Sequence, residues 1–280
     1  MQTRTRLNIA LVGGLVVIGL LFWLAGREQA GQAPLLDRDP SAVSQVSVEA
    51  EGELRWRMAR RDEGWWLEEP ESGPADRERV GQLLPLLRAP VHARYPLEEV
   101  EPAQFGLDEP VLVIQVDGER LAVGDGEPVN RRRYVQRGND DIVLVDEIVY
   151  FQFDRPGREF LDHRLLPAGA AVEAITFSGH ELTRDDEGRW RLEPMPEAYQ
   201  AEDNERLIEN WQAARARKLS GFDGEADGAA VAVRLVDGRE RRFLVLEDEE
   251  GLVLASPDTG LRYRFPAREA DALLPPGNDD

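Results

Sequence analysis

Apolar residues gather most strongly at the start of the chain. The nineteen residues Leu7–Ala25 contain no charge, and Asn8 is their only distinctly polar side chain. A helix of that length, rising about 1.5 Å per residue, almost spans the roughly 30 Å hydrocarbon core of a membrane. Arg4 and Arg6 precede the run, and positive charge marks the cytoplasmic end of a membrane helix. Residues 1–26 are therefore predicted to be a cytoplasmic start and a single membrane anchor, with the remaining chain outside the cytoplasm, which in a bacterium means anchored in the inner membrane and facing the periplasm.

The same start also fits a cleaved signal peptide. Basic residues, an apolar run and small residues such as Gly31 and Ala33 can together form a cleavage site. The run is longer than the roughly 7–15 residues usual in such a peptide, which favours a retained anchor. Residues 27–40 are polar and contain glycine and proline, so they are predicted to be a tether.

A second pattern occurs twice in the rest of the chain. DEGWWLEEP at residues 62–70 and DEGRWRLEP at residues 186–194 agree at six of nine positions. Alternation places Trp65 with Leu67, or Trp190 with Leu192, on one face of a strand, where they would fill a core. An alignment of Trp65 with Trp190 needs a slip of one residue. The repeated motif indicates two copies of one structural unit.

Each motif leads into a segment with helical spacing. The first segment, residues 75–88, has apolar residues at the i, i+3, i+4 and i+7 positions: Val80, Leu83, Leu84 and Leu87. The second, residues 201–218, follows the same spacing less cleanly. Both segments start with acidic residues, which suit a helix N-terminus. Pro85 is expected to kink or end the first helix.

Hairpins and a closing helix follow in both copies. Asp117-Gly118 and Asp237-Gly238 each separate two apolar runs and predict tight type I′ turns. Further short strands are expected in corresponding places: residues 134–136, 142–145, 252–255 and 261–265. Helical segments are expected to close the units at residues 147–153 and 267–274.

These elements predict an α+β fold with an internal repeat. An N-terminal transmembrane helix is followed by two similar units, residues 41–160 and 161–280, each a twisted antiparallel sheet with packed helices. The boundary is expected between Asp154 and Val172. The alternative is that Trp-Leu strands and Asp-Gly turns recur by chance in a β-rich chain, but their shared order favours duplication.

Composition excludes several classes of function and leaves the predicted fold unchanged. The chain is 42% hydrophobic and 31% charged, which is typical of a folded protein, and its formal net charge is -20. A surface this acidic repels phosphate backbones, so no nucleic-acid partner is expected. The chain has no cysteine, which excludes disulfides, thiol nucleophiles and thiolate metal sites. The acidity also fits a saline habitat or a GC-rich genome, between which the sequence does not decide.

The sequence offers no recognisable catalytic or metal-binding motif. The three histidines, His92, His163 and His180, are widely separated and are expected to be surface or packing residues. Ser178 and Ser220 lack the surroundings of a nucleophilic serine, and no phosphate-binding loop is present. Gly124-Asp125-Gly126 begins like a dinucleotide-binding loop but is expected to be a turn. Acidic clusters such as 202–203, 247–250 and 278–280 are expected to be solvated surface. Catalytic, cofactor-binding and metal-binding residues are therefore predicted to be none, and no cofactor is expected.

Two further features are expected to be structural. The segment Phe105–Pro110 has a glycine and a proline that fix a turn, a leucine that can pack and an aspartate that can cap. The tryptophans are expected in cores rather than on sugar-stacking surfaces, although an exposed pair would favour a binding surface. The five concerned are Trp56, Trp65, Trp66, Trp190 and Trp211.

Together these residues resemble a known family, the bacterial domain-of-unknown-function family 4340. The resemblance covers nearly the whole chain and rests on the basic start and single membrane helix, the Trp65-x-Leu67-x-x-Pro70 strand end, Ala75-Asp76 before a helix, and Phe105–Pro110. The last matches the family's Tyr/Phe-Gly-Leu-Asp-x-Pro segment, with Phe105 where tyrosine is common. The resemblance implies an exported, membrane-attached protein, often encoded beside an ABC-type transporter and an auxiliary subunit similar to gliding-motility transport proteins. It supplies no catalytic residues.

The function expected from these observations is that of a non-enzymatic, membrane-anchored periplasmic accessory protein. Its expected partners are the inner membrane, through Leu7–Ala25, and an ABC-type transporter or another envelope protein. One alternative is an envelope hydrolase whose carboxylates converge only in the fold. Another is a sensor of a small ligand or ion, with its site in a cleft between the units.

Overall fold

The computed structural model describes residues 33–196, 199–248 and 251–275. The predicted anchor, Leu7–Ala25, lies outside these residues. Within the described ranges, no helix is both long enough and apolar enough to cross a membrane. The chain forms two compact units, one with the described residues up to Val43, Val48–Glu53 and Gln82–Asp154, the other with Ser44–Ser47, Leu54–Gly81 and the described residues from Arg155 onward.

The first of two antiparallel sheets has nine strands in the order β4-β3-β2-β1-β6-β7-β8-β9-β5. Its strands are β1 (Gln45–Ala50), β2 (Glu53–Arg61), β3 (Gly64–Glu69), β4 (Gly73–Pro74), β5 (Ala93–Pro96), β6 (Leu112–Val116), β7 (Glu119–Glu127), β8 (Arg132–Arg137) and β9 (Asp141–Asp146).

The second sheet has eight strands in the order β12-β11-β10-β14-β15-β16-β17-β13. They are β10 (Val172–Phe177), β11 (His180–Arg184), β12 (Trp190–Glu193), β13 (Lys218–Gly221), β14 (Ala229–Leu235), β15 (Glu240–Asp248), β16 (Gly251–Ser256) and β17 (Leu261–Pro266).

Four α-helices accompany the sheets in the described residues: α2 (Arg77–Leu83), α3 (Ile148–Phe153), α4 (Asp203–Ala213) and α5 (Ala267–Leu273). The 3-10 turns are η1 (Pro40–Ala42), η2 (Leu84–Arg88), η3 (Leu97–Glu99), η4 (Pro102–Phe105) and η5 (Gly157–Phe160). The longest of these helices, α4, has 11 residues. The structure is thus mostly β, a correction to the predicted α+β balance, because the two helical patterns extend over fewer residues than their sequence spacing suggested.

Both sheets are built along the same path. A three-stranded meander, β1–β3 or β10–β12, is followed by a helix and then by a short strand at the opposite edge. A four-stranded meander, β6–β9 or β14–β17, then fills the sheet, so that the short strand pairs with the last one. The first sheet differs by one additional strand, β4. The predicted order of strands and helices therefore occurs in both halves of the chain.

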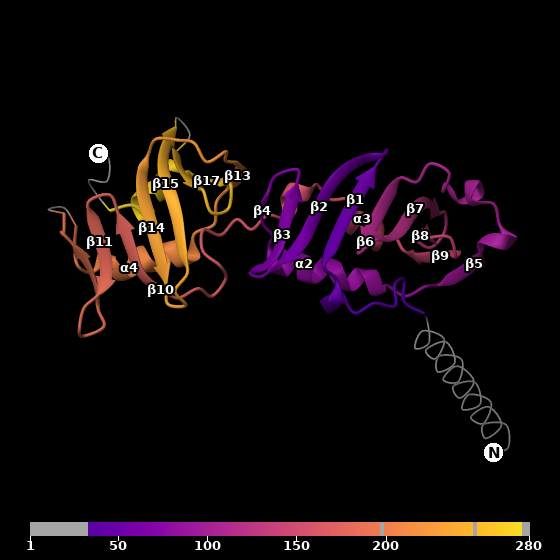
Figure 1. Ribbon diagram of the computed structural model, residues 1–280, viewed down its shortest axis with the longest axis horizontal. Coiled ribbons are helices and arrows are strands. Elements are labelled where there is room, and N and C mark those ends of the chain that lie inside the picture. The colour runs from indigo at the N-terminus through magenta and orange to yellow at the C-terminus, as the bar shows by residue number, and fades with distance from the viewer. Residues whose placement is uncertain (1–32, 197–198, 249–250, 276–280) are drawn as a thin grey trace, which may run out of the picture. The chain divides into compact units, whose positions relative to one another are not determined.

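Helix α4 shows how these sheets obtain a core. Its Leu207, Ile208 and Trp211 are buried, as the helical spacing indicated. The helix lies on one face of the second sheet (Figure 1). The Trp211 ring lies between Phe177 of β10 and Phe243 of β15, with ring centroids 6.2 and 5.6 Å away. Its indole nitrogen donates a 2.8 Å hydrogen bond to the carbonyl of Leu273, so the polar part of the side chain is also satisfied.

The tryptophans divide into two groups. Trp56, Trp190 and Trp211 are buried, as expected of core residues. Trp65 and Trp66 are only half-buried, although Leu67 on the same strand is fully enclosed. The expected core pair of indole and leucine is thus realised by Trp190 and Leu192 and only in part by Trp65 and Leu67.

Local signals were accurate for some turns and misleading for others. Helix α2 ends at Leu83, and the chain continues as the 3-10 turn η2 with Pro85 near its start. Pro85 therefore lies where the α-helix ends, as expected. Asp117 and Gly118 both have positive φ, 47° and 89°, as a type I′ turn requires. At the second Asp-Gly pair Gly238 has a positive φ, 85°, and Asp237 does not, so that turn is not of type I′.

The N-terminal edge of the described chain is part of the folded body. Leu35 and Leu36 are buried, and their backbone N–H groups donate 2.8 Å hydrogen bonds to the carbonyls of Ala89 and Leu87. The segment predicted as a tether therefore ends in packed residues.

Candidate functional site

A pocket with a volume of about 660 Å³ lies within the second compact unit. It is lined by the β2–β3 turn, by residues around β4, by the segment that follows η5, by the start of β15, and by β17 and the turn before it. Its charged side chains are six arginines, Arg60, Arg61, Arg77, Arg164, Arg239 and Arg241, and three acidic residues, Asp62, Glu63 and Asp162.

One wall is the hairpin that carries the first copy of the repeated motif. The two strands pair Arg60 with Trp65 and Arg61 with Gly64, which leaves Asp62 and Glu63 as the turn. The Arg60 guanidinium lies 5.5 Å from the centroid of the Trp65 ring, and the Arg61 guanidinium lies 4.6 Å from that of Trp66. Arginine over an indole face is a favourable cation–π arrangement. The hairpin therefore presents cations and aromatic surface together.

The start of β15 supplies cations from a distant part of the sequence. Arg239 and Arg241 both form ion pairs with Glu63, and the longer of the two is 3.7 Å. Arg239 also pairs with Asp237 at 2.7 Å, which raises the pKa of that guanidinium. A single carboxylate at the hairpin turn is thus shared by two arginines.

Asp162 is the enclosed carboxylate of the pocket. Burial raises its pKa, and the nearby negative charge of Asp76 acts in the same direction. The backbone N–H of Arg164 donates to it at 3.0 Å and opposes that shift, as does the Arg164 side chain 3.6 Å away. Asp76 itself accepts hydrogen bonds from the N–H groups of Glu78 and Arg79 at the start of α2, where an acidic residue was expected.

Tyr263 is a buried residue of the pocket lining. Burial raises its pKa to about 12, and its hydroxyl donates to Thr259 at 3.3 Å. Because arginine does not lose its proton in proteins and this tyrosine stays neutral, most polar groups of the pocket cannot move protons near neutral pH. Their chemistry is suited to holding an anion in place.

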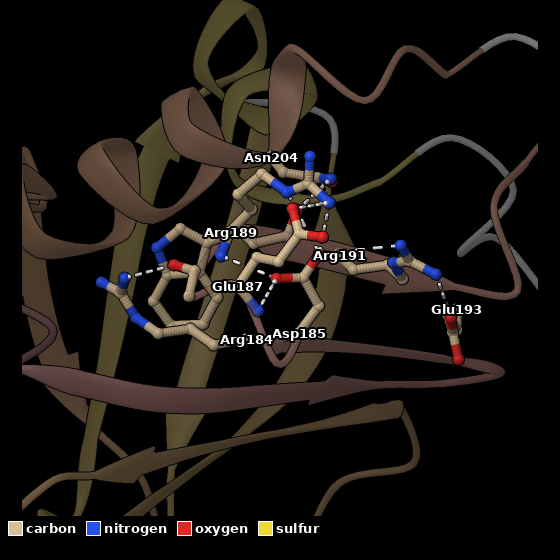
Figure 2. A network of polar contacts seen from close by, with 9 residues as sticks. Arg184, Asp185, Glu187, Arg189, Arg191, Glu193 and Asn204 are labelled. Carbon is tan, nitrogen blue, oxygen red and sulfur yellow. Dashed lines mark hydrogen bonds and ion pairs between the residues drawn. The ribbon is translucent and has the colours of Figure 1, made fainter.

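The turn that carries the second copy of the motif makes different contacts, centred on Asp185, the residue just before that copy (Figure 2). Its carboxylate accepts from the N–H groups of Glu187 and Arg189 at 3.0 and 2.9 Å and from the Arg189 side chain. These bonds, foremost that from the Arg189 N–H, lower the pKa of Asp185. Asn204 of α4 donates to the Trp190 carbonyl at 2.9 Å. This hairpin is therefore stabilised mainly by its own turn and by α4.

The histidines all make hydrogen bonds away from one another. His92 meets Asp146 at 2.9 Å, His163 meets the Ala216 carbonyl at 2.8 Å, and His180 meets the Pro194 carbonyl at 2.6 Å. All three are half-buried, in agreement with a surface or packing role. In the ranges that the structure describes, no three histidine, aspartate or glutamate side chains gather as a metal site would require.

The arginine cluster was not predicted from the sequence. Arg60 and Arg61 lie next to the repeated motif, and Arg239 and Arg241 follow the predicted Asp237-Gly238 turn. Only the fold brings the pairs to one pocket. The pair Trp65 and Trp66 lies in this pocket, half-buried rather than exposed as the predicted sign of a binding surface required.

Comparison with known protein families agrees with the resemblance seen in the motifs. The family model described as Domain of unknown function (DUF4340) matches residues 65–222, which is more than half of the chain. The matched range starts at Trp65 in the pocket wall and includes Phe105–Pro110. No curated protein and no solved structure matches the chain. The chain belongs to the DUF4340 family.

Proposed function

We propose that this protein is a non-enzymatic accessory protein of the bacterial envelope. Leu7–Ala25 holds it in the inner membrane, and its β-rich body acts in the periplasm by binding other molecules. The uncharged run Leu7–Ala25, which follows two arginines, supports the membrane anchor and its orientation. The resemblance to the family implies an ABC-type transport complex as the neighbour of this protein.

We also propose that the body arose by duplication of one unit, a sheet with helices packed on it. The two sheets share their strand order apart from β4. In both, the DEG motif lies where the turn leads into the third strand, β3 or β12. Two copies of one scaffold permit one copy to remain a structural support while the other acquires a binding surface.

The observation that carries the binding role is the different use of the repeated motif. In the second copy Glu187, the counterpart of Glu63, pairs with Arg189 of its own turn at 2.7 Å, and Asp185 just before the motif accepts hydrogen bonds from that turn. In the first copy Glu63 is instead shared by two arginines of a pocket. Paired, permanently charged side chains around an open volume are typical of recognition.

A cross-linked pull-down tests the accessory role. The full-length protein and a form beginning at Gly31 are expressed side by side, extracted in mild detergent and analysed by mass spectrometry. We expect subunits of a membrane transport complex to be enriched with the full-length protein and strongly reduced without residues 1–30. Enrichment of no envelope protein by either form would contradict the accessory role.

The raised pKa of Asp162 supports one second candidate, an envelope hydrolase, because the general acid of such enzymes is a carboxyl group whose pKa is raised by its surroundings. Two other pocket carboxylates, Asp62 and Glu63, lie at the hairpin turn. Hydrolysis of peptidoglycan or polysaccharide by the purified protein, lost in Asp162→Asn, would favour this role over the accessory role.

A further inference from the structure

We infer that the arginine-lined pocket is a binding site for a small polyanion, a molecule that bears two or more carboxylate or phosphate groups. This inference goes beyond the accessory role and does not depend on it. It concerns residues within one compact unit.

The first observation is a local reversal of charge. The lining has six arginines and three acidic residues, whereas the whole chain has a formal net charge of -20. Positive charges concentrated around one pocket attract anions more strongly than the same charges spread over a surface. The acidic remainder of the chain repels extended polyanions, so the site selects small ones.

The second observation concerns the partners of these arginines. Arg61 pairs with Glu68 at 3.5 Å, and Arg164 with Asp162 at 3.6 Å. Among the described residues, Arg60 and Arg77 have no carboxylate partner. Arg239 is paired with both Glu63 and Asp237, whereas Arg241 has only its share of Glu63. Arg241 therefore also retains capacity to bind an added anion.

The third observation is that the pocket has apolar walls and suits a small molecule. Its volume of about 660 Å³ falls within the range of ligand pockets, roughly 300–1,000 Å³. Trp65, Leu165 and Leu166 contribute the apolar part of the lining. Arginine guanidinium groups match carboxylate and phosphate oxygens in a bidentate geometry.

The pocket is also held in shape by tightly packed backbone. A Cβ atom on Gly73 would lie 2.6 Å from a Leu261 methyl group and 2.9 Å from one of Leu161, so β4 sits directly on those side chains. The N–H groups of Ala75 and Asp76 donate to the carbonyls of Trp65 and Phe160 at 2.8 and 2.7 Å. A site that is already ordered loses less entropy when it binds a ligand.

Calorimetric titration of the full-length protein in a non-ionic detergent tests the inference. Tripolyphosphate and citrate serve as probes and distinguish phosphate from carboxylate recognition, and the uncharged sugar trehalose serves as the negative probe. We expect saturable binding of at least one anion, weaker at high salt because the charges are then screened. Binding of neither anion would overturn the inference.

Paired variants locate the binding. Arg60→Gln with Arg77→Gln removes the two arginines that lack a carboxylate partner and is expected to weaken binding by about tenfold or more. Arg55→Gln with Arg268→Gln removes the same charge from two exposed positions outside the pocket and is expected to have little effect. Equal losses in the two double variants would contradict a site in the pocket.

Glu63→Gln is expected to strengthen anion binding, whereas the arginine substitutions weaken it. The substitution leaves Arg239 paired with Asp237 but frees Arg241 from its carboxylate, so the anion is expected to bind several times more tightly. If Glu63 and its two arginines had only a structural role, the substitution would not increase anion affinity. Unchanged or weaker binding by this variant, with its folding confirmed by circular dichroism, would count against the inference even if the accessory role stands.

Discussion

At the scale of single residues, Asp141 is a buried carboxylate between two arginines. Its side chain is 1% exposed, and Arg137 donates to both of its oxygens, at 2.8 and 2.6 Å. Arg94 forms a further ion pair with it. Arg137 also donates to the carbonyls of Pro34 and Leu35. This one carboxylate therefore orients the arginine that fastens the N-terminal segment to the first compact unit.

Asp141→Asn should destabilise that unit by about 3 kcal/mol, because it leaves Arg137 half-buried without a carboxylate. Urea unfolding measures the loss, and Asp140→Asn, at the exposed neighbouring position, is the matched control. The Arg137 hydrogen bonds lower the pKa of Asp141, so its stabilisation is present above the unfolded-state pKa of about 4 and is lost as pH falls through the lower folded-state pKa. The difference between wild type and Asp141→Asn should thus shrink in acid. An equal effect of both substitutions, or a difference independent of pH, would contradict this role.

At the scale of elements, the segment Phe105–Pro110 is explained by its contact with β7. Phe105 ends the turn η4, and Gly106 follows in the left-handed region at φ 68°. A Cβ atom on Gly124 of β7 would lie 2.1 Å from the Phe105 carbonyl oxygen and 3.0 Å from Leu107. Phe105 packs against Tyr134, with ring centroids 4.7 Å apart. The structural interpretation of this segment agrees with these contacts, whereas the expected turn at Gly124-Asp125-Gly126 is wrong, since these residues lie in a strand.

Gly124→Ala should therefore destabilise the first compact unit by about 2 kcal/mol or more, because backbone must move to admit the methyl group. Gly81→Ala is the matched control: that glycine lies in α2 with no atom within 4 Å of its added Cβ, and alanine favours a helix by about 1 kcal/mol. Thermal unfolding should show a lower transition temperature for the first variant and an unchanged or higher one for the second. A harmless Gly124→Ala would mean that the segment does not pack on β7 as described.

The elements also show where sequence reasoning succeeds. The β6–β7 and β14–β15 hairpins and the four α-helices of the described residues have local signals, namely Asp-Gly turns, helical spacing and acidic starts. Strands β5 and β13 have four residues each and pair with β9 and β17, and each residue lies 40 or more positions before its partner in the chain. A short strand whose partner is so distant gives no periodic pattern of its own.

At the scale of the whole molecule, the candidate site is a product of the fold. Arg60 and Arg239 are separated by 178 intervening residues, yet both line one pocket. The overall acidity of the chain conceals this local excess of arginine. The repeated motif indicated duplication, but it did not reveal that its first copy would face cations and its second would bind its own turn.

The proposed function rests on the claim that Leu7–Ala25 anchors the protein in the membrane. This anchoring is measured by fractionating bacterial cells that express the full-length protein with a C-terminal epitope, followed by alkaline carbonate extraction and protease treatment of spheroplasts. We predict that the protein stays in the inner-membrane fraction after carbonate and that external protease removes the epitope. Recovery of the protein in a soluble fraction, or an epitope protected in intact spheroplasts, would contradict a tethered body outside the cytoplasm.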